Sequence, residues 1–207
     1  GGFAARRAAS EACAEALGLR FLRDALPEDL SCKGMDARTA KAWRADLVDS
    51  SVNRALDALD DSGRPCSFPR GWVRHAFHDM TLVGRASYLL QHADELGLAA
   101  FEEAGRIFTE SFVSMRDELC VSRPEIDEAV RVCLEHGALG ARIVGGGFGG
   151  AVMALIPTER LEEAAQAVAT SYAVHGYAAP RFLPMTAGFA ASHDWSATAD
   201  MTDIPVN

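Results

Sequence analysis

The chain has 207 residues, of which 49% are hydrophobic, enough for one well-buried core. Its formal net charge of −9 argues against a nucleic-acid interface and against a patch for anionic membranes, because both would be basic. No apolar stretch is long enough to span a bilayer, and no signal-peptide pattern is visible.

Helical patterns occupy most of residues 1–137. The predicted helices cover, in chain order, Arg6–Leu17, Ala37–Leu59, Trp72–Leu96, a segment carrying Leu98 to Leu119, and one that begins at Ser122. An exposed loop is expected over Cys66–Gly71. Ser122 and Glu125 have the spacing of a capping box, with Ser122 at the N-cap. The fourth helix has apolar residues at alternating spacings of three and four, which indicates a buried stripe: Leu98, Phe101, Gly105, Phe108, Phe112, Met115 and Leu119.

A glycine-rich segment with a strand pattern on each side follows the helical part. The apolar residues before Gly145 and the run Ala151–Ile156 are separated by Gly145, Gly146, Gly147, Phe148, Gly149 and Gly150. A helix over Glu159–His175 and a last strand over Arg181–Thr186 come next. Strands late in a helical chain predict the α+β class. We expect one domain over residues 1–207: mainly helical over 1–137, and strand, glycine loop, strand, helix and strand over 138–195.

The purpose of the glycine loop stays open at this point. A Rossmann site needs a helix directly after its glycines, and a Walker loop needs Gly-Lys-Ser/Thr, so the sequence favours neither. A hairpin turn needs only two or three residues, fewer than this loop supplies. Glycine permits positive φ and close approach to the backbone. The functional alternative is therefore a nest of backbone N–H groups that faces an anion or a sugar.

Several segments carry a family resemblance. Arg142–Gly150 resembles the third motif of galactokinases, R-x-T-G-x-G-F-G-G-C, within the GHMP small-molecule kinase superfamily. Other segments resemble galactokinase strings in the same order: Phe3–Ala12, Arg74-His75, Glu110–Asp117 and Ser122–Asp127. The fit extends over most of the chain except the region between about Lys33 and Gly71. The resemblance implies a GHMP-kinase C-terminal domain, whose fold is a ferredoxin-like antiparallel sheet with several added helices.

The resemblance also implies an activity. The intact protein would use ATP and Mg²⁺ to phosphorylate galactose, giving galactose 1-phosphate and ADP in the cytoplasm. Gly145, Gly146, Gly147, Phe148, Gly149 and Gly150 would position the sugar and the phosphoryl group, and Phe3 would face the sugar. The family's ATP-binding loop and its catalytic Asp and Arg have no match here and are expected upstream of Gly1. We therefore expect the chain alone to be inactive and to bind no cofactor tightly.

Four positions depart from the galactokinase motifs. Phe3 stands where the family has Tyr, Phe112 replaces a His, Val144 a Thr and Ala151 a Cys. Two alternatives accommodate these changes: a galactokinase-like protein that senses sugar without turnover, and a GHMP kinase for a related sugar such as N-acetylgalactosamine or arabinose. The expected partners are a sugar and ATP, with no nucleic acid and no membrane. An unpaired strand edge would also permit a homodimer.

Other candidate sites are weaker. His75 and His78, with Asp79 beside them, have a spacing compatible with a metal, but no third ligand clusters with them, so surface or capping roles are favoured and no metal site is predicted. Arg6 and Arg7 could approach a phosphate, although salt bridges on a helix surface are favoured. The five cysteines are scattered and lack C-x-x-C, which predicts reduced thiols and a cytoplasmic protein.

Overall fold

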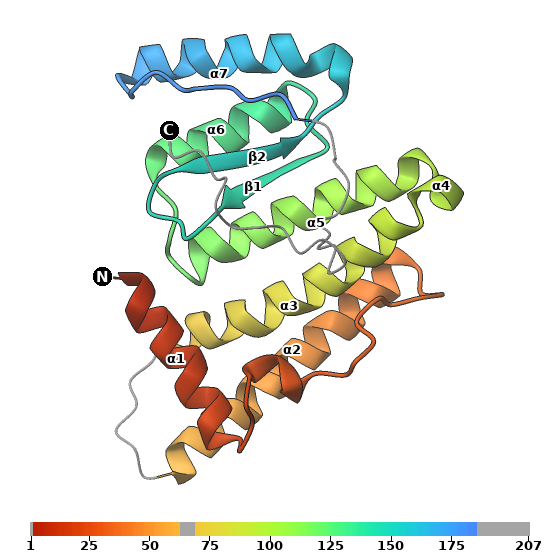
Figure 1. Ribbon diagram of the computed structural model, residues 1–207, viewed down its shortest axis with the longest axis vertical. Coiled ribbons are helices and arrows are strands. Elements are labelled where there is room, and N and C mark those ends of the chain that lie inside the picture. The colour runs from red at the N-terminus through yellow and green to blue at the C-terminus, as the bar shows by residue number, and fades with distance from the viewer. Residues whose placement is uncertain (1, 63–68, 186–207) are drawn as a thin grey trace, which may run out of the picture.

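The computed structural model describes residues 2–62 and 69–185 (Figure 1). These residues form helices and a two-stranded antiparallel sheet, so the predicted α+β class is confirmed. The elements are α1 Gly2–Ala16, η1 Leu22–Ala25, α2 Ala37–Asp61, α3 Arg70–Gln91, α4 Ala93–Leu96, α5 Leu98–Asp117, α6 Pro124–Glu135, β1 Gly140–Val144, β2 Ala151–Leu155, η2 Thr158–Arg160 and α7 Leu161–His175.

Three helices form one end of the molecule. Helices α1, α2 and α3 pack together around a core that includes Cys13, Val52, Leu59 and Phe77, all at most 2% exposed. Asp36 begins α2 because its carboxylate accepts hydrogen bonds from the N–H groups of the first turn, a preferred N-cap arrangement. Figure 1 shows α5 between this end and the end that holds α6, α7 and the sheet.

The sheet lies directly on α5. Strands β1 and β2 pair antiparallel, from Gly140 opposite Leu155 to Val144 opposite Ala151. Buried side chains of β1 pack with α5 and α6 in a core that contains Phe112, Val130 and Ile143. The backbones of α5 and β1 touch, because a Cβ atom on Gly140 would overlap the carbonyl of Gly105. Two glycines facing each other therefore allow a helix and a strand to approach more closely than side chains would permit.

Several predicted boundaries are wrong. The third helix begins at Arg70, inside the predicted loop, whose residues 66–68 lie outside the described chain. It ends at Gln91, and a short helix continues to Leu96, so the predicted Trp72–Leu96 helix is divided at His92. A 3-10 turn precedes α7, which therefore begins at Leu161. The helix ends at Gly18, Gly97 and Gly137 do carry positive φ angles.

Two predictions about side chains and the prediction of a last strand are also wrong. Leu98 and Phe101 of the predicted buried stripe are 66% and 37% exposed, because the first turn of α5 instead buries Ala100 against Leu82, Ala86 and Leu89 of α3. Ser122 is not the N-cap of α6; Arg123 holds that position, and the Ser122 hydroxyl bonds Asp127 instead. Residues 181–185 form no strand, and the sheet in the described residues has two strands rather than the fuller ferredoxin-like set.

Among the described residues, no helix combines the length and the apolar character that crossing a membrane requires.

Gly105→Ala tests the contact between α5 and β1. Alanine stabilises a helix interior by about 1 kcal/mol relative to glycine, but overpacking typically costs about 1–3 kcal/mol. The atoms in the way belong to the Leu139 backbone and cannot rotate aside. We expect a net loss of about 1 kcal/mol or more in the free energy of unfolding, measured by urea denaturation. Glu102→Ala, on the exposed face of the same helix, should change it by less than about 0.5 kcal/mol.

Candidate functional site

The glycine loop joins β1 to β2 and has an unusual backbone. Residues Gly145, Gly147, Phe148, Gly149 and Gly150 all have positive φ, from +61° at Phe148 to +112° at Gly149. L side chains disfavour this region, so four of the five positions require glycine on backbone grounds alone. A two-residue hairpin turn would need far less of this conformation.

The amides of the loop are mostly free of protein partners. The Phe148 N–H donates to the Val121 carbonyl at 2.7 Å. Within the described residues, the N–H groups of the five loop glycines have no protein acceptor. Successive backbone N–H groups in a turn conformation can form a concave donor surface that suits an anion. The loop can therefore offer several fixed donors to one ligand without a charged side chain.

Val121 packs against the glycine loop. Its side chain is fully buried, and a Cβ atom on Gly147 would lie 2.5 Å from the Val121 Cβ. The loop therefore contacts the turn that follows α5 in two ways. The Phe148 N–H bonds the Val121 carbonyl, and Gly147 packs on the Val121 side chain with no room for a side chain of its own. Gly145 and Gly150, in contrast, have open space where a side chain would stand.

The first turn of α1 lies against the other side of the loop. Phe3 is 56% exposed, and the nearest atom to a Cβ placed on Gly146 is Phe3 Cδ2, at 3.8 Å. Phe148 is 41% exposed, and its ring lies near Gly2 and under the guanidinium of Arg6, 5.1 Å from that group. The structure thus brings together Phe3 and the glycine loop, which are separated by almost the whole helical part of the sequence.

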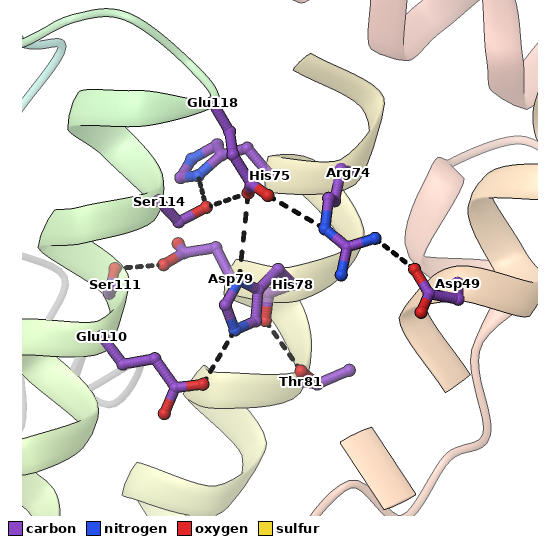
Figure 2. A network of polar contacts seen from close by, with 10 residues as sticks. All are labelled: Asp49, Arg74, His75, His78, Asp79, Thr81, Glu110, Ser111, Ser114 and Glu118. Atoms are coloured by element: carbon purple, nitrogen blue, oxygen red, sulfur yellow. Dashed lines mark hydrogen bonds and ion pairs between the residues drawn. The ribbon is translucent and has the colours of Figure 1, made fainter. Parts of the chain in front are cut away.

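A polar network lies between α3 and α5, next to the turn that supports the loop. Figure 2 shows Glu118 between Ser114, Arg74 and His78. The Ser114 hydroxyl donates to Glu118 at 2.6 Å, and the Arg74 Nε lies 2.9 Å from the same carboxylate. Arg74 also reaches Asp49 of α2, and the hydrogen bond to that carboxylate raises the pKa of Arg74. The network therefore ties α2, α3 and the end of α5 together.

Histidines occupy the centre of this network and not the surface. His75 is 9% exposed, and its Nδ1 lies 2.9 Å from the Ser114 hydroxyl. Burial lowers the pKa of His75, because the charged ring would lose its hydration, although Asp79 and Glu118 oppose the shift. His78 Nε2 lies 3.1 Å from Glu110, and this hydrogen bond lowers the pKa of the Glu110 carboxyl.

The carboxylate beside the histidines has other partners. The described residues contain no group of three His, Cys, Asp or Glu side chains placed to hold a metal ion. Asp79 instead accepts from the Ser111 hydroxyl and lies 3.7 Å from the guanidinium of Arg142 on β1. The carboxylate beside the histidines therefore joins the network to the strand that leads into the glycine loop.

The two neighbouring arginines of α1 have different roles. Arg7 forms an exposed salt bridge with Glu11 at 2.8 Å, as predicted for a helix surface. Arg6 instead bonds backbone carbonyls after α5 and stacks on Trp72 and Phe148. The prediction of a surface role for Arg6 is therefore wrong. The sequence shows the Arg-Arg pair and the two aromatic residues, Trp72 and Phe148. Their spacing along the chain could not show that Arg6 contacts both rings.

The departure at Phe112 has a structural explanation. Its side chain is 3% exposed and packs in the core beneath the sheet. A phenyl ring at this position adds core volume and does not remove a group from the loop. Val144 and Ala151, which flank the loop, are both exposed and lie beside it.

Part of this chain matches a known family model, and most of it is similar to known galactokinases. Residues 73–174 match the family model described as GHMP kinases C terminal. The chain is 32% identical over 181 residues to the galactokinase of Streptomyces coelicolor, covering 87% of this chain and 38% of that protein. It is 36% identical over 140 residues to the galactokinase of Mycobacterium tuberculosis, covering 66% of this chain and 36% of that protein.

A solved structure has the same fold. The crystal structure of Lactococcus lactis galactokinase complexed with galactose superposes with a TM-score of 0.56 at 21% identity, over 87% of this chain and 39% of that one. The chain therefore spans less than two fifths of the length of the relatives it matches.

Gly147→Ala and Gly145→Ala separate two costs within the loop. Both residues have positive φ, so an alanine at either position is strained. Only Gly147 faces Val121, so overpacking should cost a further amount of about 1–3 kcal/mol at that position alone. We expect a lower melting temperature for Gly147→Ala than for Gly145→Ala, measured by calorimetry. Equal melting temperatures would contradict the contact.

Acid should destabilise the protein through His75. The pKa of His75 lies below its ordinary value of 6.5, so the unfolded chain takes up a proton near that pH before the folded chain does. The stabilisation is present above about pH 6.5 and is lost as the pH falls toward the folded pKa. We expect urea denaturation between pH 8 and pH 5 to show a shallower loss of stability for His75→Gln than for the native chain. His136→Gln, in an exposed pair with Glu163, is the matched control.

Proposed function

Because this chain carries a GHMP kinase C-terminal domain within a stretch similar to galactokinases, we propose that it is the C-terminal part of a galactokinase-type sugar kinase. In the intact protein, the γ-phosphoryl group of ATP passes to the C1 hydroxyl of galactose. The products are galactose 1-phosphate and ADP.

The unpaired amides of the glycine loop carry this proposal. Phosphoryl transfer depends on positioning and on stabilising the charge of the transferring group. Fixed N–H donors aimed at that charge cost no reorganisation during the reaction. The positive φ angles at residues 145, 147, 149 and 150 leave such donors without protein acceptors in the described part of the chain. The loop glycines therefore hold the sugar and the phosphoryl group in place, with Phe148 keeping the shape of the loop.

Phe3 forms the sugar-facing wall in this proposal. Its exposed ring lies beside Gly146, where an apolar face of a sugar can stack. Phenylalanine cannot donate the hydrogen bond that a tyrosine hydroxyl would supply. The site therefore keeps the stacking contact of the family motif and gives up one polar contact.

The remaining catalytic groups are proposed to come from outside these residues. The sequence has no match to the family's ATP loop or to its Asp and Arg, and the described residues provide no cluster for a metal ion. ATP phosphates fit the donor character of the loop, whereas Mg²⁺ finds no ligand set here, so we derive no step through it. Turnover by the chain alone is not expected, and homodimer formation stays a prediction. A cytoplasmic location stays a prediction.

A sugar sensor without turnover is the second candidate, and the exposed departures favour it. Phe3, Val144 and Ala151 all lie at or beside the loop, where a changed side chain alters ligand contacts. Phe112 does not support it, because that residue belongs to the core. A kinase for N-acetylgalactosamine or arabinose is the third candidate, since the loop amides do not distinguish among sugars.

Sugar phosphorylation by the gene product that contains this chain tests these candidates. With ATP, Mg²⁺ and each sugar in turn, we expect galactose 1-phosphate, measured by product NMR. The 207 residues alone should give none, and measurable product would refute that part of the proposal. Binding of galactose without product would favour the sensor. A preference for another sugar would correct the substrate.

Gly149→Ala, compared with Gly176→Ala, connects turnover to the loop. Both glycines have positive φ, and a Cβ atom would meet only Arg123 Cδ, at 3.9 Å, on Gly149 and nothing within 4 Å on Gly176, which ends α7. Misplacing one donor in such a site commonly lowers kcat by about a hundredfold. We expect a loss of that order for Gly149→Ala and less than about a twofold change for Gly176→Ala. Equal effects would show that the loop has no special role.

A further inference from the structure

We propose that Arg6 is a positioning residue that clamps the glycine loop onto the turn after α5. The inference rests on the proposed function only where it assigns that loop to substrate binding. The clamp itself is argued from the contacts of Arg6, Leu119–Val121 and Phe148.

The guanidinium of Arg6 bonds carbonyls from two parts of the chain. Its Nε donates to the Leu119 carbonyl at 2.5 Å and its Nη2 to the Cys120 carbonyl at 3.1 Å. Its Nη1 donates to the Gly2 carbonyl at 2.7 Å. Three donors of one planar group thus connect the first turn of α1 to the turn that follows α5. Charge-assisted hydrogen bonds of this kind are roughly twice as strong as neutral ones.

The turn that Arg6 holds has an unfavourable backbone. Cys120 has a φ of +56°, a conformation that non-glycine residues disfavour. The Leu119 and Cys120 carbonyls, which flank the Cα atom of this strained residue, both accept hydrogen bonds from Arg6. The arginine therefore stabilises the strained conformation. That conformation directs the next carbonyl, of Val121, to the Phe148 N–H at 2.7 Å. The shape of the loop therefore depends on the turn, and the turn depends on Arg6.

Arg6 also touches the loop directly. Its guanidinium carbon lies 5.1 Å from the centroid of the Phe148 ring and 4.5 Å from that of Trp72. Phe148 is the one loop residue with a side chain, and it holds a φ of +61°. A flat cation stacked on this ring restrains both its side chain and its backbone. The clamp therefore acts at two places, on the hydrogen-bond acceptor and on the ring of the donor residue.

The chemistry specifies arginine at this position. A guanidinium can donate in its plane and stack through its faces at the same time, whereas a lysine ammonium is a compact point charge without faces. Arg7, the next residue, carries the same charge on the same helix, and its partner among the described residues is Glu11, at 2.8 Å. The chain therefore offers a matched control one position away.

Hydrogen exchange in the 207-residue chain tests the clamp. We expect Arg6→Gln to speed exchange of the Phe148 amide by about tenfold or more, because a hydrogen bond to a charged group is lost from its support. Arg7→Gln should leave it within about twofold. The Val52 amide in the core of α2 should exchange as before in both variants, which separates a loosened loop from general unfolding. Arg6→Lys should fall between the native chain and Arg6→Gln. Equal Phe148 exchange in Arg6→Gln and Arg7→Gln would overturn the clamp.

Kinetics of the gene product that contains this chain test its consequence. Arg6→Gln should lower kcat for sugar phosphorylation by about tenfold while KM for the sugar stays within about twofold, since a displaced loop mainly loses alignment with the transferring group. Unchanged kcat together with faster Phe148 exchange would overturn the positioning role. If the native protein phosphorylates no sugar, the proposed function fails, and the exchange comparison still decides whether Arg6 clamps the loop.

Discussion

The close packing of β1 on α5 determines where everything else in the site lies. At one end of the strand, Gly140 meets Gly105 backbone to backbone, so the strand cannot slide along the helix without a clash. Beyond the other end, Gly147 rests on Val121, just past the end of the same helix. Helix α5 therefore supports the strand at one point, and the turn that follows the helix supports the loop at a second. Glycine occupies both facing positions at the first contact, Gly105 and Gly140, and one of the two at the second, Gly147. Neither contact therefore has room for an added side chain.

The polar network between α3 and α5 has a different character. Its members come from facing helix surfaces, and Asp79 extends it to Arg142 on β1. A network of this kind specifies which helix faces meet, because a shifted register would leave carboxylates and histidines without partners. Its boundary is incompletely paired. Arg44 is 3% exposed, lies 3.9 Å from Glu110, and keeps two nitrogens without a protein partner in the described residues.

The sequence predicted the features that depend on local chemistry. The strand, glycine loop and strand follow from apolar runs and adjacent glycines, and both strands and the loop lie where the pattern placed them. The exposed Leu98 and Phe101 show the limit of periodicity, since a stripe of large apolar residues does not show that the first turn of the helix is covered on its Ala100 face instead. The last strand failed because a single apolar run gives no information about its pairing partner. The role of Arg6 could not be predicted, because its acceptor Leu119 is 113 positions away.

This separation in sequence has a consequence for the order in which the protein forms. The hairpin of β1 and β2 can close from local contacts, but the turn beneath its loop is complete only when α1 has docked. Helix α1 is anchored by few buried residues, Ala9, Cys13 and Ala14, none of them large. Partial detachment of its first turn would release Arg6 while leaving the cores around Phe77 and Phe112 intact. The hairpin therefore forms with the rest of the fold, whereas the final shape of its loop depends on whether the first turn of α1 is docked.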